Sequence, residues 1–217
     1  MTSKHKRIPR KPEPVHKPTP IASVVSGFPV IKNIGLRHVH VADTMVCDID
    51  GTHGRLTYRG YPIETLADNS SFEETVFLLL NGRMPLKEEL SSLLLTMNKE
   101  RWLPTSPSAS LSRLRSDDQP TDILQGYVAF LAGYDPELSV QNRESTIRKA
   151  IRLVSKMGSA VALWARLREG KEPVPSREDL SHAANFLYML TGEEPDPVKA
   201  QVLDTCLRDD LVGGEQT

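Results

Sequence analysis

The sequence predicts a mainly α-helical protein with one small β-hairpin near its N-terminus. Three observations indicate this fold class. Apolar residues recur at the spacing of one helix face in successive segments after residue 62. Serine, asparagine, glycine and proline stand at the ends of these segments, where helices begin and stop. An Asp-Gly pair between two short extended segments marks a hairpin before them, and no alternation of strands and helices follows it.

The hairpin and helix boundaries follow from local chemistry. Asp50-Gly51 suits a tight turn that needs positive φ, and Pro62 suits the first turn of a helix. Asn142 is expected to begin the longest helix and Gly170 to stop it. The expected elements are strands at 39–47 and 55–58, a helix at 62–67, a helix capped by Ser70 or Ser71 and ended by Gly82, a helix at 86–100, a loop at 104–120, a helix from Thr121 or Asp122 to about 133, and helices at 142–169, 179–190 and 196–208.

Length, composition and cysteine content indicate an ordinary globular protein. The 217 residues suit one domain or slightly more, and 39% hydrophobic with 25% charged residues is typical of such domains. The net charge of -1 gives no attraction to nucleic acid or to an anionic membrane, so neither partner is expected. Cys47 and Cys206 do not form the pattern of a disulfide framework. With no signal peptide and no apolar run of the ~20 residues that span a membrane, we expect a reduced, cytoplasmic protein.

Residues 1–33 are predicted to form a basic, proline-rich, disordered arm. Positions 1–20 carry six Lys or Arg residues against one Glu, a net charge of +5, which leaves −6 for the remainder. The prolines between Pro9 and Pro20 oppose the amphipathic helix of a mitochondrial presequence. A solvated tail is the simpler interpretation, and weak binding of nucleic acid or of a partner by the tail is the alternative.

The segment Asp48-Ile49-Asp50-Gly51-Thr52 matches the nucleophile motif of haloacid-dehalogenase-type phosphatases. That chemistry needs the first Asp at the end of a buried parallel strand beside Mg²⁺. Here the preceding apolar run is short and helices follow, so a hairpin turn is the preferred interpretation. A calcium loop is excluded, because His53 and Arg59 stand where such a loop needs Gly and Glu.

No other pattern assigns chemistry. His38 and His40 share one face of an extended segment, but no third metal ligand is evident, so structural histidines are preferred. The sequence holds no nucleophile elbow and no glycine-rich phosphate loop. We therefore predict no catalytic, cofactor-binding or metal-ligating residue and no cofactor.

Several long segments together resemble the N-terminal half of citrate synthase, in its shorter bacterial and archaeal form, which includes 2-methylcitrate synthase. The resemblance covers about residues 34–207. Its matching segments are Gly35-Leu36, ADT at 42–44, DIDGTHGRLTYRGYPIETLA at 48–67, SFEETVFLLLNGRMP at 71–85, EEL at 88–90, KAIRLVSKM at 149–157, RLREG at 166–170 and DLSHAANFLYMLTGEEPD at 179–196.

The resemblance implies a helical large domain at 34–208, without the family's small domain, and a tail at 209–217 outside the family. Family members form homodimers through antiparallel large-domain helices. The long helix here resembles one of these and carries small residues that let a second helix approach closely. The residues expected at a dimer interface are Ile151, Ser155, Gly158, Ser159 and Ala162.

The family condenses acetyl-CoA or propionyl-CoA with oxaloacetate, using two histidines and an aspartate that follow the matched region. Because no histidine follows His182, none of these roles transfers to this chain. We expect a protein that is truncated before its catalytic residues and is inactive alone. It should bind acetyl-CoA and oxaloacetate only when the missing half of the synthase completes it. Alternatives are a non-catalytic partner that forms a homodimer or a heterodimer with a full-length synthase, one half of a split synthase, or a frameshifted remnant. Missing core helices would leave an apolar face, for which Phe186, Leu187, Met189 and Leu190 are candidates.

Overall fold

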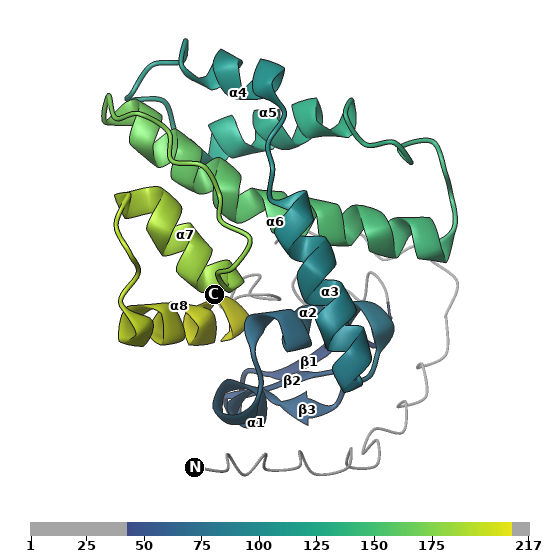
Figure 1. The fold of residues 1–217 in the computed structure, drawn as a ribbon. Coiled ribbons are helices and arrows are strands. Elements are labelled where there is room, and N and C mark those ends of the chain that lie inside the picture. The colour runs from purple at the N-terminus through teal and green to yellow at the C-terminus, as the bar shows by residue number, and fades with distance from the viewer. Residues whose placement is uncertain (1–42, 210–217) are drawn as a thin grey trace, which may run out of the picture.

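The computed structural model describes residues 43–209, which form eight helices and one small sheet (Figure 1). These residues confirm a mainly helical fold with an N-terminal hairpin. The strands are β1 (Cys47–Asp50), β2 (Arg55–Tyr58) and β3 (Tyr61–Pro62). The helices are α1 (Ile63–Asn69), α2 (Phe72–Asn81), α3 (Lys87–Glu100), α4 (Thr105–Leu111), α5 (Pro120–Ala132), α6 (Arg143–Arg168), α7 (His182–Thr191) and α8 (Pro197–Asp209).

The sheet is antiparallel in the order β1-β2-β3. Asp50 pairs with Arg55 across the predicted turn, and Tyr58 pairs with both Cys47 and Tyr61. Strand β3 is not among the expected elements, and the turn that leads into it places Arg59 at φ 51. The first strand was also expected too early: residues 43–46 are not strand, and positions 39–42 lie outside the described residues.

Side-chain capping explains several helix starts. Ser71 and Glu74 form a capping box on α2, and Asn142 accepts a hydrogen bond from the backbone N–H of Ser145 at 2.8 Å to begin α6. The expected loop at 104–120 was wrong, because Pro104 precedes a real helix, α4, that buries Leu111.

Two further helix starts differ from the prediction. Gln119, rather than Thr121 or Asp122, precedes α5, because Pro120 occupies its first turn. Ser181, rather than Asp179, caps α7, since the Asp179 carboxylate pairs with Arg177 instead.

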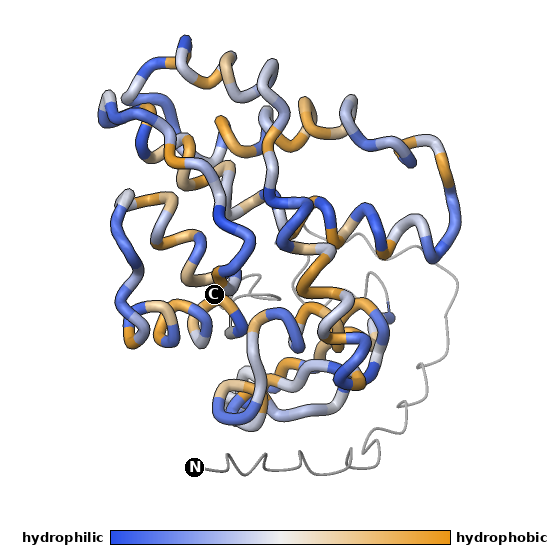
Figure 2. Tube along the Cα trace, in the orientation of Figure 1, coloured by the Kyte–Doolittle hydropathy of each residue, from blue (hydrophilic) through white to orange (hydrophobic). Residues whose placement is uncertain are grey.

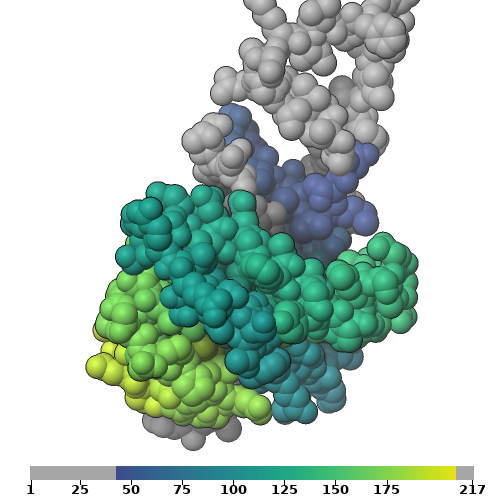
Figure 3. All heavy atoms as spheres, turned by 90° about the horizontal axis from the view of Figure 1, so that it is seen from above, coloured from purple at the N-terminus to yellow at the C-terminus, as the bar shows by residue number. Residues whose placement is uncertain are grey.

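The 26-residue helix α6 lies at the centre of the fold. In Figure 1, α4 and α5 lie along one side of it, and α3 and α7 pack against it on the other. Helix α8 then packs beneath α7 and reaches α1 and α2. Figure 3 shows α4, α5 and α6 together covering one face of the molecule. The division into an arm, a domain at 34–208 and a tail stays a prediction.

The buried side chains form three clusters, and the hydropathy-coloured trace in Figure 2 shows apolar segments in every layer. One cluster centres on Tyr127 and Trp164 between α5 and α6, and a second on Phe72 and Met97. The third places Tyr58 of the sheet against α1 and α2. The sheet is therefore part of the core and not an appendage.

Candidate functional site

The Asp-rich hairpin turn is held by its own carboxylate. Asp50 Oδ1 accepts hydrogen bonds from the backbone N–H groups of Thr52 and His53 at 3.1 and 3.2 Å. Its Oδ2 lies 2.7 Å from His53 Nδ1, and these contacts lower the pKa of Asp50, the His53 side chain most strongly. The aspartate is thus an ionised turn residue.

The turn does not have the geometry of a phosphatase site. The strand that carries Asp48 pairs antiparallel with β2 in a three-stranded sheet, whereas the phosphatase motif needs a buried parallel strand. The preferred hairpin interpretation is therefore confirmed. No cluster of three or more His, Cys, Asp or Glu side chains suited to a metal ion occurs among residues 43–209. His38 and His40 lie outside the described residues.

A buried polar joint connects the starts of α2 and α7. The His182 ring stacks on Phe72 with centroids 4.7 Å apart, and the His182 backbone N–H donates to Glu73 Oε1 at 2.9 Å. A β-carbon added at Gly158 of α6 would lie 3.2 Å from His182 Nε2, so this glycine makes room for the ring. The histidine is enclosed by three helices.

The environment of His182 favours its neutral form. Burial, aided by the positive charge of Arg101, lowers the pKa of His182 to about 4. The side chain is 7% exposed, and Nδ1 has no hydrogen-bond partner among the described residues. An imidazole enclosed in this way packs a helix joint and does not face a substrate.

The five residues expected at a dimer interface lie on α6, and one of them, Gly158, lies against α7 of the same chain. Ser155, Ser159 and Ala162 are buried, and Gly158 contacts His182 of α7. The close helix approach that small residues permit is thus made within this chain. Ile151 is half-buried beside the Phe72 cluster. Their role between two chains stays a prediction.

The exposed apolar surface lies elsewhere than expected. Met189 is buried at 6% exposure, and Phe186, Leu187 and Leu190 are half-buried, so the α7 face was the wrong candidate. Instead, four exposed apolar side chains line a cavity of about 380 Å³ between the end of α3, α5 and α6. We call this surface the Trp102 groove, and its exposed large apolar residues are Trp102, Tyr134, Leu138 and Leu153.

Ion pairs line the same groove. Arg152 of α6 holds Asp135 at 2.8 Å, and Lys156 holds Glu100 at 2.6 Å. These paired charges leave the apolar side chains as the surface available for contact. Trp102 is 64% exposed, which is unusual for the largest side chain of a groove and indicates an interaction surface.

This groove is not predictable from the sequence, because helical periodicity assigns apolar residues to a core face without saying which faces stay uncovered. The one available signal was the Trp102-Leu103-Pro104 segment, which places an aromatic residue just after a helix end. In the part of the chain that the structure describes, no helix is both long and apolar enough to cross a membrane.

Comparison with known proteins agrees with the fold. A family model described as citrate synthase, C-terminal domain, matches residues 35–208. Citrate synthase of Acidithiobacillus ferridurans is 39% identical over 178 residues, which are 80% of this chain and 46% of that protein. Citrate synthase of Haloferax volcanii is 40% identical over 177 residues, again 80% of this chain and 47% of that protein.

Solved structures give the same result. The crystal structure of citrate synthase from Pyrobaculum aerophilum superposes with a TM-score of 0.77 at 35% identity, covering 92% of this chain and 52% of that one. The structure from Thermotoga maritima superposes with a TM-score of 0.71 at 33% identity, over 86% and 48% of the two chains. This chain spans about half the length of the curated relatives it matches.

Proposed function

This chain belongs to the citrate synthase family, and we propose that it supplies a helical large-domain scaffold for the condensation of acetyl-CoA with oxaloacetate without catalysing that reaction alone. One observation carries the proposal. The described residues contain two histidines, His53 and His182, and neither is placed for acid/base chemistry. We also retain a cytoplasmic location as a prediction.

The chemistry explains why this observation matters. Removing a proton from a thioester methyl group needs a base within hydrogen-bond reach of the carbon acid and a donor for the developing enolate oxygen. His182 is enclosed between Phe72 and α6, and His53 lies in an exposed turn with its side chain 64% accessible. His182 is thus covered by its own chain, whereas His53 is open to water.

The direct test is release of free CoA, followed with a thiol reagent, from acetyl-CoA and oxaloacetate by the purified chain. The citrate synthase of Haloferax volcanii serves as the positive control under the same conditions. We expect a rate equal to the enzyme-free blank. Turnover above the blank that scales with protein concentration would refute the scaffold proposal.

The Trp102 groove supports a second candidate function, that of a non-catalytic partner which binds a second polypeptide of the same family. Tryptophan and tyrosine are the residue types that most often anchor protein interfaces, and both are exposed at this concave surface. The partner is either a second copy of this chain or a longer synthase. The completed assembly would then hold the substrates.

Light scattering of the purified chain, alone and with a full-length relative, tests this function. We expect a mass above that of a monomer in at least one of the two samples. Trp102→Ser should shift it towards the monomer, because it removes the largest exposed apolar side chain of the groove. Leu95→Ser is the matched control, since Leu95 is equally exposed at 63% but lies outside the groove. Monomers in both samples would exclude the partner function.

A further inference from the structure

The chain contains two places where a glycine follows an aspartate or an asparagine, Asp50-Gly51 and Asn81-Gly82. At such a pair the side-chain carbonyl carbon and the backbone nitrogen of the glycine can close a five-membered ring, because no β-carbon shields that nitrogen. The ring later opens to isoaspartate. The structure holds the two pairs in different ways, and this difference is independent of the proposed function.

The Asn81-Gly82 pair is tied into the last turn of α2. The Asn81 side-chain Nδ2 donates to the Phe77 carbonyl at 3.1 Å. The Gly82 N–H, which carries the attacking nitrogen, donates to the Leu78 carbonyl at 2.7 Å. Both reacting groups are therefore engaged in hydrogen bonds, and ring closure would first need the end of the helix to open.

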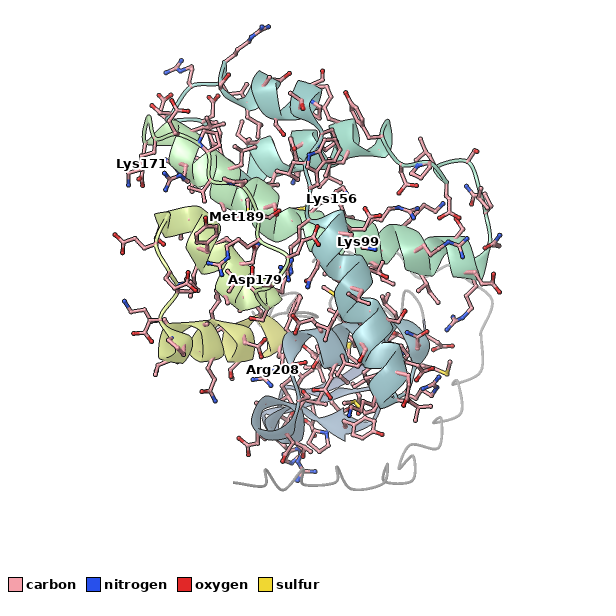
Figure 4. All side chains as sticks on the ribbon, viewed as in Figure 1. Lys99, Lys156, Lys171, Asp179, Met189 and Arg208 are labelled. Atoms are coloured by element: carbon pink, nitrogen blue, oxygen red, sulfur yellow. The ribbon has the colours of Figure 1, made fainter. Side chains whose placement is uncertain are left out.

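The Asp50-Gly51 pair lies in the exposed turn between β1 and β2. Figure 4 shows this sheet at the end of the molecule opposite α4 and α5. Within residues 43–209 the Gly51 N–H makes no hydrogen bond. Nothing lies within 4 Å of a β-carbon added at Gly51, so no packed side chain restrains this piece of backbone.

The Asp50 carboxyl group is folded forward over the same turn. Its Oδ1 accepts hydrogen bonds from the backbone N–H groups of Thr52 and His53 at 3.1 and 3.2 Å, the two residues that follow Gly51. The contact of Oδ2 with His53 Nδ1 at 2.7 Å acts differently, because it stabilises the ionised carboxylate. Ring closure needs the protonated carboxyl group, whose hydroxyl is the leaving group.

We propose that Asp50 is a site of spontaneous isomerisation to isoaspartate and that His53 slows the reaction. The Gly51 nitrogen bonds to the side-chain carboxyl carbon of Asp50, and the nitrogen's proton leaves with the carboxyl hydroxyl as one water molecule. A second water molecule then opens this succinimide at the former backbone carbonyl of Asp50. The chain now runs through the former side chain, and its mass is unchanged.

The modification alters the sheet. Isoaspartate adds one methylene group to the backbone at a residue that pairs with Arg55 of β2. It also removes the side-chain acceptor that holds the turn. Because Tyr58 of β2 belongs to a core cluster with Leu66 and Leu78, a displaced strand disturbs the packing of α1 and α2.

Prolonged incubation of the purified chain at neutral pH tests the proposal. An isoaspartate-specific methyltransferase with labelled S-adenosylmethionine measures total isoaspartate, and electron-transfer fragmentation of proteolytic peptides locates it. We expect isoaspartate at position 50 that increases with time, while Asn81 stays asparagine. No isoaspartate at position 50, or more modification at position 81 than at position 50, would overturn the proposal.

Three exposed turn variants test the chemistry. Gly51→Ala should slow the reaction at least about fivefold, because a β-carbon crowds the attacking nitrogen. The fold tolerates it, since Gly51 lacks the positive φ of Gly54. His53→Ala should speed the reaction at least about twofold, because the carboxyl group is then protonated more often. Thr52→Ala is the matched control and should keep the wild-type rate, since only the Thr52 backbone contacts Asp50.

The rates of the variants decide between two parts of the proposal. An unchanged rate in Gly51→Ala would refute ring closure through the Gly51 nitrogen. A rate in His53→Ala equal to that of Thr52→Ala would refute the protective role of His53.

Discussion

The helical hairpin α2–α3 and the helical hairpin α7–α8 are built from the same local signals. Each begins with a ten-residue helix that a serine caps and a left-handed glycine ends, Gly82 at φ 78 and Gly192 at φ 83. A proline follows each glycine, and helices of 14 and 13 residues come next. The two hairpins meet at their first helical residues, where Phe72 stacks on His182.

They differ in where their caps come from. Helix α2 has a complete capping box of its own, whereas α7 draws on Glu73 of α2 for the backbone N–H of His182. In return, Asp204 of α8 accepts a hydrogen bond from the backbone N–H of Phe72 at 3.2 Å. Buried Arg208 also donates to the carbonyls of Leu66 and Ser70 at the end of α1. The two hairpins therefore have similar sequence signals at their ends, but the stability of α7–α8 depends more on contacts from α2–α3 than the reverse.

The largest expected effect is at Glu73, the shared cap. Glu73→Ala should lower the free energy of unfolding by about 3 kcal/mol, because it leaves the buried His182 N–H unbonded and removes the negative charge facing Arg101. Urea denaturation measures this. Glu88→Ala, an exposed first-turn glutamate of α3, is the matched control and should stay near wild type. Equal stabilities of the two variants would show that α7 does not depend on α2.

Because His182 lies in the joint between α2 and α7, the free energy of unfolding should depend on pH. Burial holds the pKa of His182 near 4 in the folded chain. In the unfolded chain the histidine binds a proton below about pH 6.5, whereas in the folded chain it stays neutral until the pH approaches 4. Stability is therefore full above pH 6.5 and falls as the pH drops towards 4. The loss should be about 2 kcal/mol between pH 7.5 and pH 5.

Denaturation curves at the two pH values check this loss. His182→Gln should remove the pH dependence, and His53→Gln, in the exposed turn, should keep it. A pH dependence that survives in His182→Gln would assign the titration to another group.

Gly158 tests how closely α6 approaches α7. Gly158→Leu should destabilise the fold by about 1.5 kcal/mol, because even a β-carbon there lies 3.2 Å from His182 Nε2. Gly126 of α5 is the control, since nothing lies within 4 Å of an added β-carbon. Gly126→Ala should raise the free energy of unfolding by about 1 kcal/mol, because alanine favours a helix more than glycine does. Thermal denaturation of both variants measures the difference, and a tolerated Gly158→Leu would mean that α7 moves freely away from α6.

The smallest effect compares the two serine caps. Ser71→Ala should cost about 1 kcal/mol, because it breaks a reciprocal capping box. Ser181→Ala should cost less, since Glu73 still accepts a hydrogen bond from the first N–H of α7. Urea denaturation of the single variants and of Ser181→Ala with Glu73→Ala checks this. An additive double variant would show that the two caps act independently.

Local chemistry explains which helix boundaries can be predicted from the sequence alone. Ser71, Asn142, Gly82 and Gly192 mark helix ends by their own conformational preferences, so those boundaries were predictable. Helix α4 was missed because its serines and prolines are weak helix formers, and packing of Leu111 against Tyr127 and Trp164 overrides that preference.

The sites were harder to predict than the elements. The small face of α6 was recognised, but periodicity does not say whether the helix that approaches it belongs to the same chain, and here α7 does. Trp102 and Arg101 are adjacent in sequence, yet one is 64% exposed and the other 1%. Only the loop that folds back from α6 to α7 decides which of the two is covered.

The central proposal is that this chain supplies the family scaffold without catalysing the family reaction alone. The most direct measurement is mass-spectrometric detection of labelled citrate after long incubation of the purified chain with ¹³C-acetyl-CoA and oxaloacetate. We predict no labelled citrate above the enzyme-free control, because neither described histidine is placed to assist proton removal. Labelled citrate that accumulates in proportion to protein, and is lost in His182→Gln or His53→Gln, would contradict the account.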